Sequence, residues 1–310
     1  MKKIIITGPT GAIGHALIEK CLQEQCEIYA ICRPKSERIK NLPDNIKLHI
    51  IECDLAELMN AEAQLPKNCD IFYHFAWNGT FGETRNDMIL QIKNIKYTIE
   101  AVNLAKKCGC HTFIGAGSQA EYGNGRVKGK LRDDTPVFPE NGYGMAKLCA
   151  GQMSRLEAHK YGLKHIWTRI LSVYGPYDGA YTMVMSSIQK MLKKEKTSFT
   201  KGEQQWDYLY SKDAGGIMYD LAEKGIDGKI YCLGSGKAKQ LKYYIEVIRN
   251  NIDINLPIGF GEIPYSDKQV MYLCADVSDL LNDLNYKYQY DFEKGIKETI
   301  EWCKENYIEK

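Results

Sequence analysis

The stretch "ITGPTGAIG", residues 6–14, places a glycine at every third position from Gly8 to Gly14. Residues 2–6 before it have the composition of a short buried strand, and residues 12–25 after it have helical apolar periodicity. A glycine-rich turn between a strand and a helix lets the backbone approach a pyrophosphate, which the free N–H groups and positive dipole end of the helix attract. An ordinary tight turn explains the same glycines, so the rest of the chain must decide.

Composition limits the class of protein. The 310 residues fit one large domain or two modest ones, and the net charge of +2 with no basic block gives no sign of nucleic-acid binding. The 11 cysteines are scattered, and Cys108 and Cys110 lack metal-ligand spacing. The apolar run at the N-terminus is too short for a signal peptide, and no stretch approaches the ~20 apolar residues of a membrane span. We therefore expect a cytoplasmic protein with reduced thiols and no membrane or metal site.

Strand-like and helix-like segments alternate up to residue 176, and the second long helix-like segment ends at Gly109, a plausible C-cap. The strand-like segments are 2–7, 26–33, 46–54, 70–77, 110–118 and 164–176, and the helix-like segments are 12–25, 86–109 and 143–162. This alternation predicts a parallel sheet with helices on both faces. After residue 176 the segments shorten and tyrosines become frequent, which indicates a smaller cap; residues 228–236 are expected to return to the main sheet.

Ligands bind at the carboxyl ends of the strands in such a sheet. The second strand ends at Arg33, where an arginine suits the 2′-phosphate of NADP and an acidic residue would suit NAD; a solvated basic loop is the alternative. Asp54 follows the third strand, where a carboxylate can meet an adenine amino group. We expect His74, near the end of the fourth strand, to be a packed strand residue. The fifth strand ends in a hydroxyl at Ser118.

Tyr143 and Lys147 lie four residues apart on a predicted helix and so share one face. A free phenol has a pKa of about 10, and a nearby ammonium together with an oxidised nicotinamide would favour the phenolate. Such a tyrosine can exchange a proton with a carbinol oxygen during hydride transfer, and Ser118 would hydrogen-bond the same oxygen. Tyrosine and lysine at this spacing are also common on helix surfaces; their order after the glycine turn and Ser118 favours the catalytic interpretation.

With these motifs the chain resembles the extended short-chain dehydrogenase/reductase family, in its nucleotide-sugar epimerase/dehydratase branch. The resemblance covers nearly the whole chain. It rests on T-G-x-x-G-x-x-G at 7–14, Asp54-Leu55, Asn94, "GSQAEYG" at 117–123, "YGMAK" at 143–147, "VYGP" at 173–176, "WDYLYSKDAGG" at 206–216 and "FEKGIKETIEWCKEN" at 292–306. It implies a Rossmann-type doubly wound parallel sheet with a small C-terminal α/β substrate-binding domain. It also implies a homodimer joined through the two long helices.

The resemblance also implies site residues. Residues 1–173, with a return of about 206–233, would form the dinucleotide-binding domain, and 174–205 and 234–310 the substrate-binding cap. Ser118, Tyr143 and Lys147 would be catalytic. Cofactor contacts are expected from Gly8, Thr10, Gly11, Ala12, Ile13, Gly14, Arg33, Asp54, Leu55, Phe75, Ala76, Trp77, Asn94, Ala116, Tyr143 and Lys147. Substrate contacts are expected from Trp77, Thr80, Arg85, Ser118, Tyr143, Tyr174 and Trp206, with packing in the cap as the alternative for the aromatic residues.

Missing residues narrow the branch. Sugar 4,6-dehydratases carry Thr-Asp-Glu where this chain has Ser118-Gln119-Ala120, so an acid pair for dehydration is absent from the sequence. Epimerase-reductases like fucose synthase carry a cysteine near Ala120 and a histidine after the YGP segment, and this chain has no histidine after His165. A 4-keto-sugar reductase using NADP is therefore the preferred function. The alternatives are a nucleotide-sugar 4-epimerase with tightly held NAD and a non-catalytic dinucleotide-binding sensor.

Overall fold

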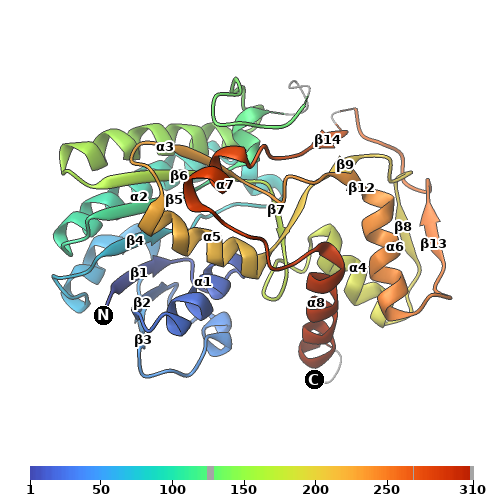
Figure 1. The fold of residues 1–310 in the computed structure, drawn as a ribbon, viewed down its shortest axis with the longest axis horizontal. Coiled ribbons are helices and arrows are strands. Elements are labelled where there is room, and N and C mark those ends of the chain that lie inside the picture. The colour runs from blue at the N-terminus through green and yellow to red at the C-terminus, as the bar shows by residue number, and fades with distance from the viewer. Residues whose placement is uncertain (124–128, 268, 308–310) are drawn as a thin grey trace.

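The computed structural model describes residues 1–123, 129–267 and 269–307. Within these residues, seven strands form one parallel sheet in the order β11-β6-β5-β4-β1-β2-β3 (Figure 1). Their bounds are β1 Lys3–Thr7, β2 Glu27–Cys32, β3 Leu48–Glu52, β4 Ile71–His74, β5 Thr112–Ser118, β6 Lys164–Ile170 and β11 Ile230–Leu233. The strand order reverses between β1 and β4, where doubly wound sheets open a crevice. The predicted fold class is confirmed.

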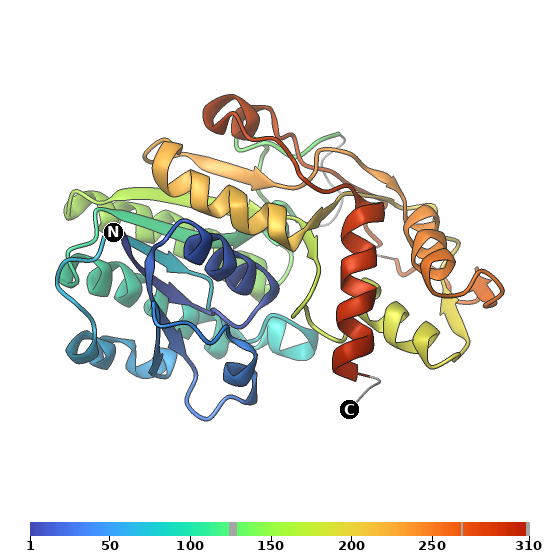
Figure 2. The same cartoon turned by 60° about the horizontal axis from the view of Figure 1, so that its bottom comes forward.

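Helices cover both faces of the sheet (Figure 2). Their bounds are α1 Ala12–Gln23, α2 Met88–Lys107, α3 Gly142–Lys160 and α5 Ser211–Lys224. Ile4 and Ile6 of β1 join the core that α1 and α5 complete, whereas Ile5 joins the core beneath α2 and α3. Successive side chains of a strand point to opposite faces, so the apolar run in β1 serves both cores.

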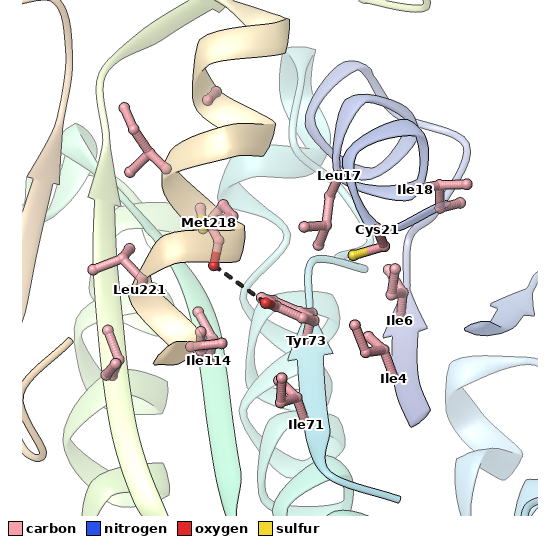
Figure 3. Packing of buried hydrophobic residues seen from close by; sticks show 14 of the residues in the cluster. Ile4, Ile6, Leu17, Ile18, Cys21, Ile71, Tyr73, Ile114, Met218 and Leu221 are labelled. Carbon is pink, nitrogen blue, oxygen red and sulfur yellow. Dashed lines mark hydrogen bonds between the residues drawn. The ribbon is translucent and has the colours of Figure 1, made fainter. Parts of the chain in front are cut away.

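Tyr73 of β4 lies in the core beneath α1 and α5 and is fully buried (Figure 3). Its hydroxyl donates a hydrogen bond of 3.2 Å to the carbonyl oxygen of Met218 in α5. A buried phenol needs such a partner, because an unsatisfied hydroxyl in an apolar core costs free energy. The contact joins the centre of the sheet to α5, a helix from the second half of the chain.

The cap lies to one side of the main sheet and is built from short elements (Figure 1). Its helices are α4 Met183–Leu192, α6 Leu241–Ile252 and α8 Phe292–Tyr307, and its strands are β8 Thr197–Phe199, β9 Gln205–Trp206, β12 Lys239–Gln240, β13 Ile258–Phe260 and β14 Tyr272–Leu273. Buried residues of α4, α6 and α8 share one apolar core. The helix α7 Ser278–Leu284 follows β14, and the 3-10 helices are η1 Glu37–Asn41, η2 Leu55–Gln64, η3 Gly82–Asn86 and η4 Gln119–Tyr122.

One predicted strand differs from the structure. The segment 164–176 is divided: β6 ends at Ile170, and β7 (Ser172–Tyr174) pairs instead with β10 (Tyr208–Tyr210) in a separate small sheet. Ile170 is opposite the last residues of both neighbouring strands, so the ladder has no further partner there. Residues Ile230–Leu233 do return to the main sheet as β11, beside β6, as predicted. The last three residues of the expected cap, 308–310, lie outside the described residues.

Candidate active site

The glycine turn after β1 is closely packed. Gly8 has a φ of +70°, and a Cβ there would lie 2.7 Å from the amide nitrogen of Ala76. A Cβ on Gly14 would lie 2.4 Å from the carbonyl oxygen of Gly8. Gly11 is the N-cap of α1 and supplies no capping side chain, so the first amides of the helix stay available to an anion. The turn therefore fits a dinucleotide pyrophosphate.

Two adjoining cavities open beside this turn, and Gly8, Gly11, Phe75 and Trp77 line both. The first, of about 270 Å³, lies at the ends of β2 and β3. The second, of about 330 Å³, lies at the ends of β5 and β6. Lining residues from the expected set are Thr10, Arg33, Asp54, Leu55 and Ala76 in the first cavity, and Ala12, Ile13, Gly14, Thr80, Ala116, Ser118, Tyr143 and Lys147 in the second.

The first cavity has the character of an adenosine-phosphate subsite. Arg33, Ser36 and Arg38 line it. Its one lining carboxylate, among the described residues, is Asp54, which caps η2 by accepting a hydrogen bond of 2.9 Å from the amide nitrogen of Ala56. Two guanidinium groups and a hydroxyl in one lining can hold an anion.

The second cavity brings Ser118, Tyr143 and Lys147 together. Asn141 starts α3 by accepting a 2.8 Å hydrogen bond from the amide nitrogen of Gly144, which places Tyr143 in the first turn. Lys147 is 3% exposed, and its Nζ donates to the carbonyl oxygen of Ala116 at 2.5 Å. Three side chains from β5 and α3 thus converge at the end of the sheet, although they are 29 residues apart in sequence at most (Ser118 to Lys147).

Burial and neighbouring groups act in opposite directions on the pKa of Tyr143. Burial raises the pKa of Tyr143, and its hydrogen bond with Ser118 and the charge of Arg85 oppose this rise. Burial also lowers the pKa of Lys147 to about 7, against the charge of Glu121. The expected lowering of the Tyr143 pKa depends on the Lys147 ammonium together with an oxidised nicotinamide, and the protein groups alone do not produce it. Burial opposes the charged form of both side chains, which raises the tyrosine pKa and lowers the lysine pKa.

Trp77 and Arg85 surround the Tyr143 ring. The Nζ of Lys147 lies 3.7 Å from the centroid of the Trp77 ring, and the rings of Trp77 and Tyr143 meet edge to face at 6.1 Å. The guanidinium carbon of Arg85 lies 4.4 Å from the Tyr143 centroid, nearer than the Nζ of Lys147 at 5.8 Å. An Arg85 nitrogen also donates to the carbonyl oxygen of Thr80 at 3.1 Å. Two of the predicted substrate-binding residues are therefore near Tyr143: Thr80 lines the second cavity, and Arg85 lies beside the Tyr143 ring.

Three predicted contacts are placed elsewhere. Asn94 is buried, and its amide exchanges hydrogen bonds of 2.8 and 3.0 Å with the backbone of Asn78, so it braces the loop after β4 and does not line either cavity. Tyr174 is 1% exposed within the cap core, where its hydroxyl donates to the carbonyl oxygen of Phe292. Trp206 donates to Ser172 Oγ at 2.7 Å and also lines neither cavity. The burial of Tyr174 favours the packing alternative for that residue, whereas Trp206 is only partly buried and its contact with substrate stays a prediction.

Asp178 was missed. It lines the second cavity, accepting hydrogen bonds from the amide nitrogen of Gly179 at 2.7 Å and from Thr182 Oγ1 at 2.9 Å. Burial raises the pKa of this carboxyl group to about 6. Its position directly after "YGPY" was the one available signal in the sequence.

Two classes of site find no support in the described part of the chain. No cluster of three or more histidine, cysteine or acidic side chains there has the arrangement of a metal site. No helix among the same residues combines the length and apolar character needed to span a membrane. All 11 cysteines of the sequence are free thiols, as predicted.

Comparison with known proteins agrees with this geometry. Residues 4–234 match the model of the NAD dependent epimerase/dehydratase family. CDP-abequose synthase of Salmonella muenchen is 24% identical and aligns over 96% of this chain and 97% of its own length. The fold is similar to that of UDP-glucose 4-epimerase from Thermotoga maritima, at 21% identity and a TM-score of 0.88 over 98% of this chain and 99% of that one.

A further similar structure is UDP-glucuronic acid 4-epimerase from Bacillus cereus, described in complex with NAD, at 20% identity and a TM-score of 0.84 over 98% of this chain and 99% of that one. The family match spans most of the chain, and the matched range includes the glycine turn, Tyr143, Lys147 and all the residues that line the two cavities. The chain is an enzyme of the short-chain dehydrogenase/reductase type that uses a nicotinamide dinucleotide, and it belongs to the NAD dependent epimerase/dehydratase family.

Proposed function

We propose that this enzyme reduces the keto group of a nucleotide-activated 4-keto-sugar. The observation that carries the proposal is the second cavity, where Ser118, Tyr143 and Lys147 line the space next to the glycine turn. Tyr143 would give its proton to the carbonyl oxygen, and Ser118 would hydrogen-bond that oxygen. A bound nicotinamide dinucleotide would supply the hydride to the carbonyl carbon. Gln119 and Ala120 offer no acid pair for dehydration.

NADPH is the proposed form of the cofactor. Arg33, Ser36 and Arg38 line the end of the cleft where a 2′-phosphate would lie, and β2 ends without an acidic residue for a ribose diol. A reductase must exchange its oxidised cofactor for a reduced one after every turnover, and NADPH is proposed as this exchanged cofactor. The similarity to CDP-abequose synthase over nearly the whole chain is compatible with a CDP-linked or related nucleotide sugar as substrate.

A 4-epimerase with retained NAD is the second candidate. Arg38, which lines the first cavity, donates to the carbonyl oxygen of Tyr177 at 2.5 Å, and the Tyr177 ring stacks on His15 at 3.7 Å. These contacts tie the segment before Asp178 to the loop after β2, beside both cavities. A cofactor enclosed by them would exchange slowly, as an epimerase requires. The two similar solved structures described above are also epimerases.

The first experiment identifies the cofactor. Purified protein is denatured, any released nucleotide is identified, and protein without nucleotide is titrated with NADPH and NADH. The proposal expects little bound nucleotide and tighter binding of NADPH. Near-stoichiometric NAD would favour the epimerase instead.

Turnover then separates the functions. The two assays are NADPH oxidation with dTDP-4-keto-6-deoxyglucose and interconversion of UDP-galactose with UDP-glucose. Tyr143→Phe should reduce whichever activity is present by about a hundredfold or more. Binding of the dinucleotide without either activity would favour the sensor, and full activity of Tyr143→Phe would contradict the proposed chemistry.

We also propose a homodimer. Exposed apolar side chains lie on α2 and on α3, the two long helices of one face of the sheet. They are Met88, Ile89 and Ile92 on α2, and Met145, Met153 and Leu156 on α3, with exposed fractions between 47% and 65%. Exposed apolar side chains on two neighbouring helices favour a protein interface there. The division into a dinucleotide-binding domain of 1–173 with 206–233, and a cap of 174–205 and 234–310, also remains a proposal.

A further inference from the structure

Glu121 lies directly behind Ser118 and is fully buried in η4. Its Oε1 accepts hydrogen bonds from the backbone nitrogen of Ser118 at 2.9 Å and from Nε1 of Trp167 at 3.0 Å. Its Oε2 accepts from Nε of Arg169 at 2.8 Å. Three donors from the two neighbouring strands β5 and β6 therefore hold one carboxylate, and one of them is the backbone of a predicted catalytic residue.

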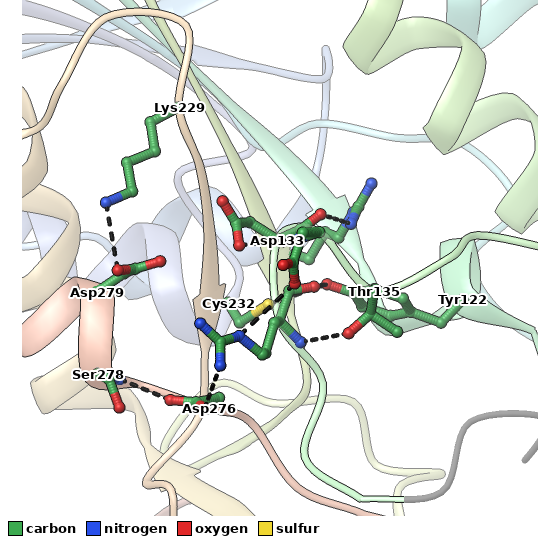
Figure 4. Close-up of polar contacts among 11 residues, drawn as sticks. Tyr122, Asp133, Thr135, Lys229, Cys232, Asp276, Ser278 and Asp279 are labelled. Atoms are coloured by element: carbon green, nitrogen blue, oxygen red, sulfur yellow. Dashed lines mark hydrogen bonds and ion pairs between the residues drawn. The ribbon is translucent and has the colours of Figure 1, made fainter.

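Arg169 is itself held on the side away from Ser118. Its Nη1 donates to the carbonyl oxygen of Asp133 at 3.0 Å, and its guanidinium carbon lies 4.6 Å from the centroid of the Tyr122 ring. The Tyr122 hydroxyl donates to the carbonyl oxygen of Arg132 and contacts the sulfur of Cys232 at 3.0 Å (Figure 4). Both members of the Glu121–Arg169 pair are at most 3% exposed. A buried ion pair adds little net stability, so the Glu121–Arg169 pair contributes mainly by fixing the positions of the groups that it contacts.

The pair determines the conformation of Ser118. Ser118 and Glu121 form a capping box, in which the Ser118 hydroxyl accepts a 3.2 Å hydrogen bond from the amide nitrogen of Ala120. This contact occupies one acceptor site of the hydroxyl and leaves its proton free to point toward Tyr143. The box also needs a glycine before Ser118, since a Cβ on Gly117 would lie 2.4 Å from Oε1 of Glu121.

We propose that Glu121, paired with Arg169, is a positioning residue that holds Ser118 as a hydrogen-bond donor beside Tyr143. This role rests on the proposed function, since it assumes that Ser118 contacts the reacting oxygen. Glu121 touches no reacting atom and acts through the Ser118 backbone. Loss of its charge would let the end of β5 shift, and the Ser118 hydroxyl would then move away from the Tyr143 hydroxyl.

The test compares Glu121→Gln with the wild type. In this variant an amide NH₂ faces a donor, either Arg169 Nε or the Ser118 nitrogen. We expect kcat to fall about tenfold or more with KM nearly unchanged, because a misplaced donor weakens the transition state more than the ground state. The matched control is Asp283→Asn, which removes a carboxylate that accepts hydrogen bonds of 2.7 Å from Lys229 and Tyr231 and belongs to α7, a helix that lines neither cavity. The control should lose stability and keep kcat.

A double-mutant cycle with Ser118→Ala separates positioning from general destabilisation. If Glu121 acts through the Ser118 hydroxyl, Glu121→Gln should cost less than about twofold in kcat when Ser118 is already alanine. Two losses that multiply would overturn the proposal. The assay is reduction of dTDP-4-keto-6-deoxyglucose or interconversion of UDP-galactose, whichever the wild type catalyses.

A crystal structure of Glu121→Gln decides the question without turnover. We expect the Ser118 hydroxyl to move away from the Tyr143 hydroxyl, and an unchanged Ser118 would overturn the proposal. Activity of Tyr143→Phe at the wild-type level would instead refute the proposed function, whatever Glu121→Gln does. The two failures are therefore distinguishable.

Discussion

Replacing Lys147 with methionine should make the folded protein more stable and the enzyme inactive. Lys147 is 3% exposed, and burial lowers its pKa from the ordinary value of 10.5 to about 7. At about 1.4 kcal/mol per pKa unit, burying the charged lysine costs about 5 kcal/mol below pH 7. Methionine removes this cost but leaves the carbonyl oxygen of Ala116 without its partner, a loss of about 1–3 kcal/mol. The expected net gain at pH 6 is roughly 2–4 kcal/mol.

The gain in stability from Lys147→Met should become smaller as the pH rises above 7. Between pH 7 and pH 10.5 the unfolded chain holds the Lys147 proton and the folded chain releases it, so wild-type stability rises with pH. At pH 9 the remaining cost is about 2 kcal/mol, and the advantage of Lys147→Met should have shrunk by about 3 kcal/mol relative to pH 6.

Urea unfolding of the wild type and Lys147→Met, at pH 6, pH 7.5 and pH 9, measures this difference. Lys297→Met replaces an exposed lysine of α8 and serves as the control, with no such pH dependence expected. A Lys147→Met variant that is less stable at pH 6, or an advantage that stays constant up to pH 9, would refute the reasoning about burial. Turnover of the same variant should be lost, since the proposed chemistry needs the ammonium beside Tyr143.

Three further predictions concern single residues. Arg33→Ala should raise the dissociation constant of NADPH about tenfold or more and change that of NADH less than about twofold, because it removes a charge-assisted contact to the 2′-phosphate; equal effects in fluorescence titrations would contradict this. Asp178→Asn should raise the melting temperature at pH 8 and raise it less at pH 4.5. Burial raises the pKa of Asp178 from 3.8 to about 6, so the cost of ionisation in the wild type grows between these two pH values and is fully present above pH 6. Ile92→Asp should convert a dimer into a monomer in light scattering, whereas an unchanged mass would exclude α2 from the interface.

Much of the fold was predictable because local sequence carries it. The alternation of strands and helices, the glycine turn and the capping glycine after α2 depend on neighbouring residues alone. Gly109, for example, has a φ of +82° directly after the end of that helix. The division of the sixth strand was not predictable, since it depends on where β5 and β11 end beside it.

The candidate site divides in the same way. The sequence placed Ser118, Tyr143 and Lys147 on their elements, and the rule that parallel strands end at one edge of the sheet brought them together. The roles of Tyr174 and Trp206 stayed open in the sequence because an aromatic residue in the cap has the same local pattern whether it faces a ligand or the core. Asp178 was missed because nothing local distinguishes it from a loop carboxylate.

The sequence by itself determined the dinucleotide-binding fold, the family and the helical spacing of Tyr143 and Lys147. Only the tertiary structure decided which groups leave water and which distant segments meet. Glu121 and Arg169 are 48 residues apart in sequence, and Arg38 and Tyr177 are 139 apart. Burial raises the pKa of Tyr143, an effect that its helical spacing from Lys147 does not reveal. Periodicity reports the face on which a residue lies, whereas desolvation and charge depend on what packs against that face, and this depends on the whole fold.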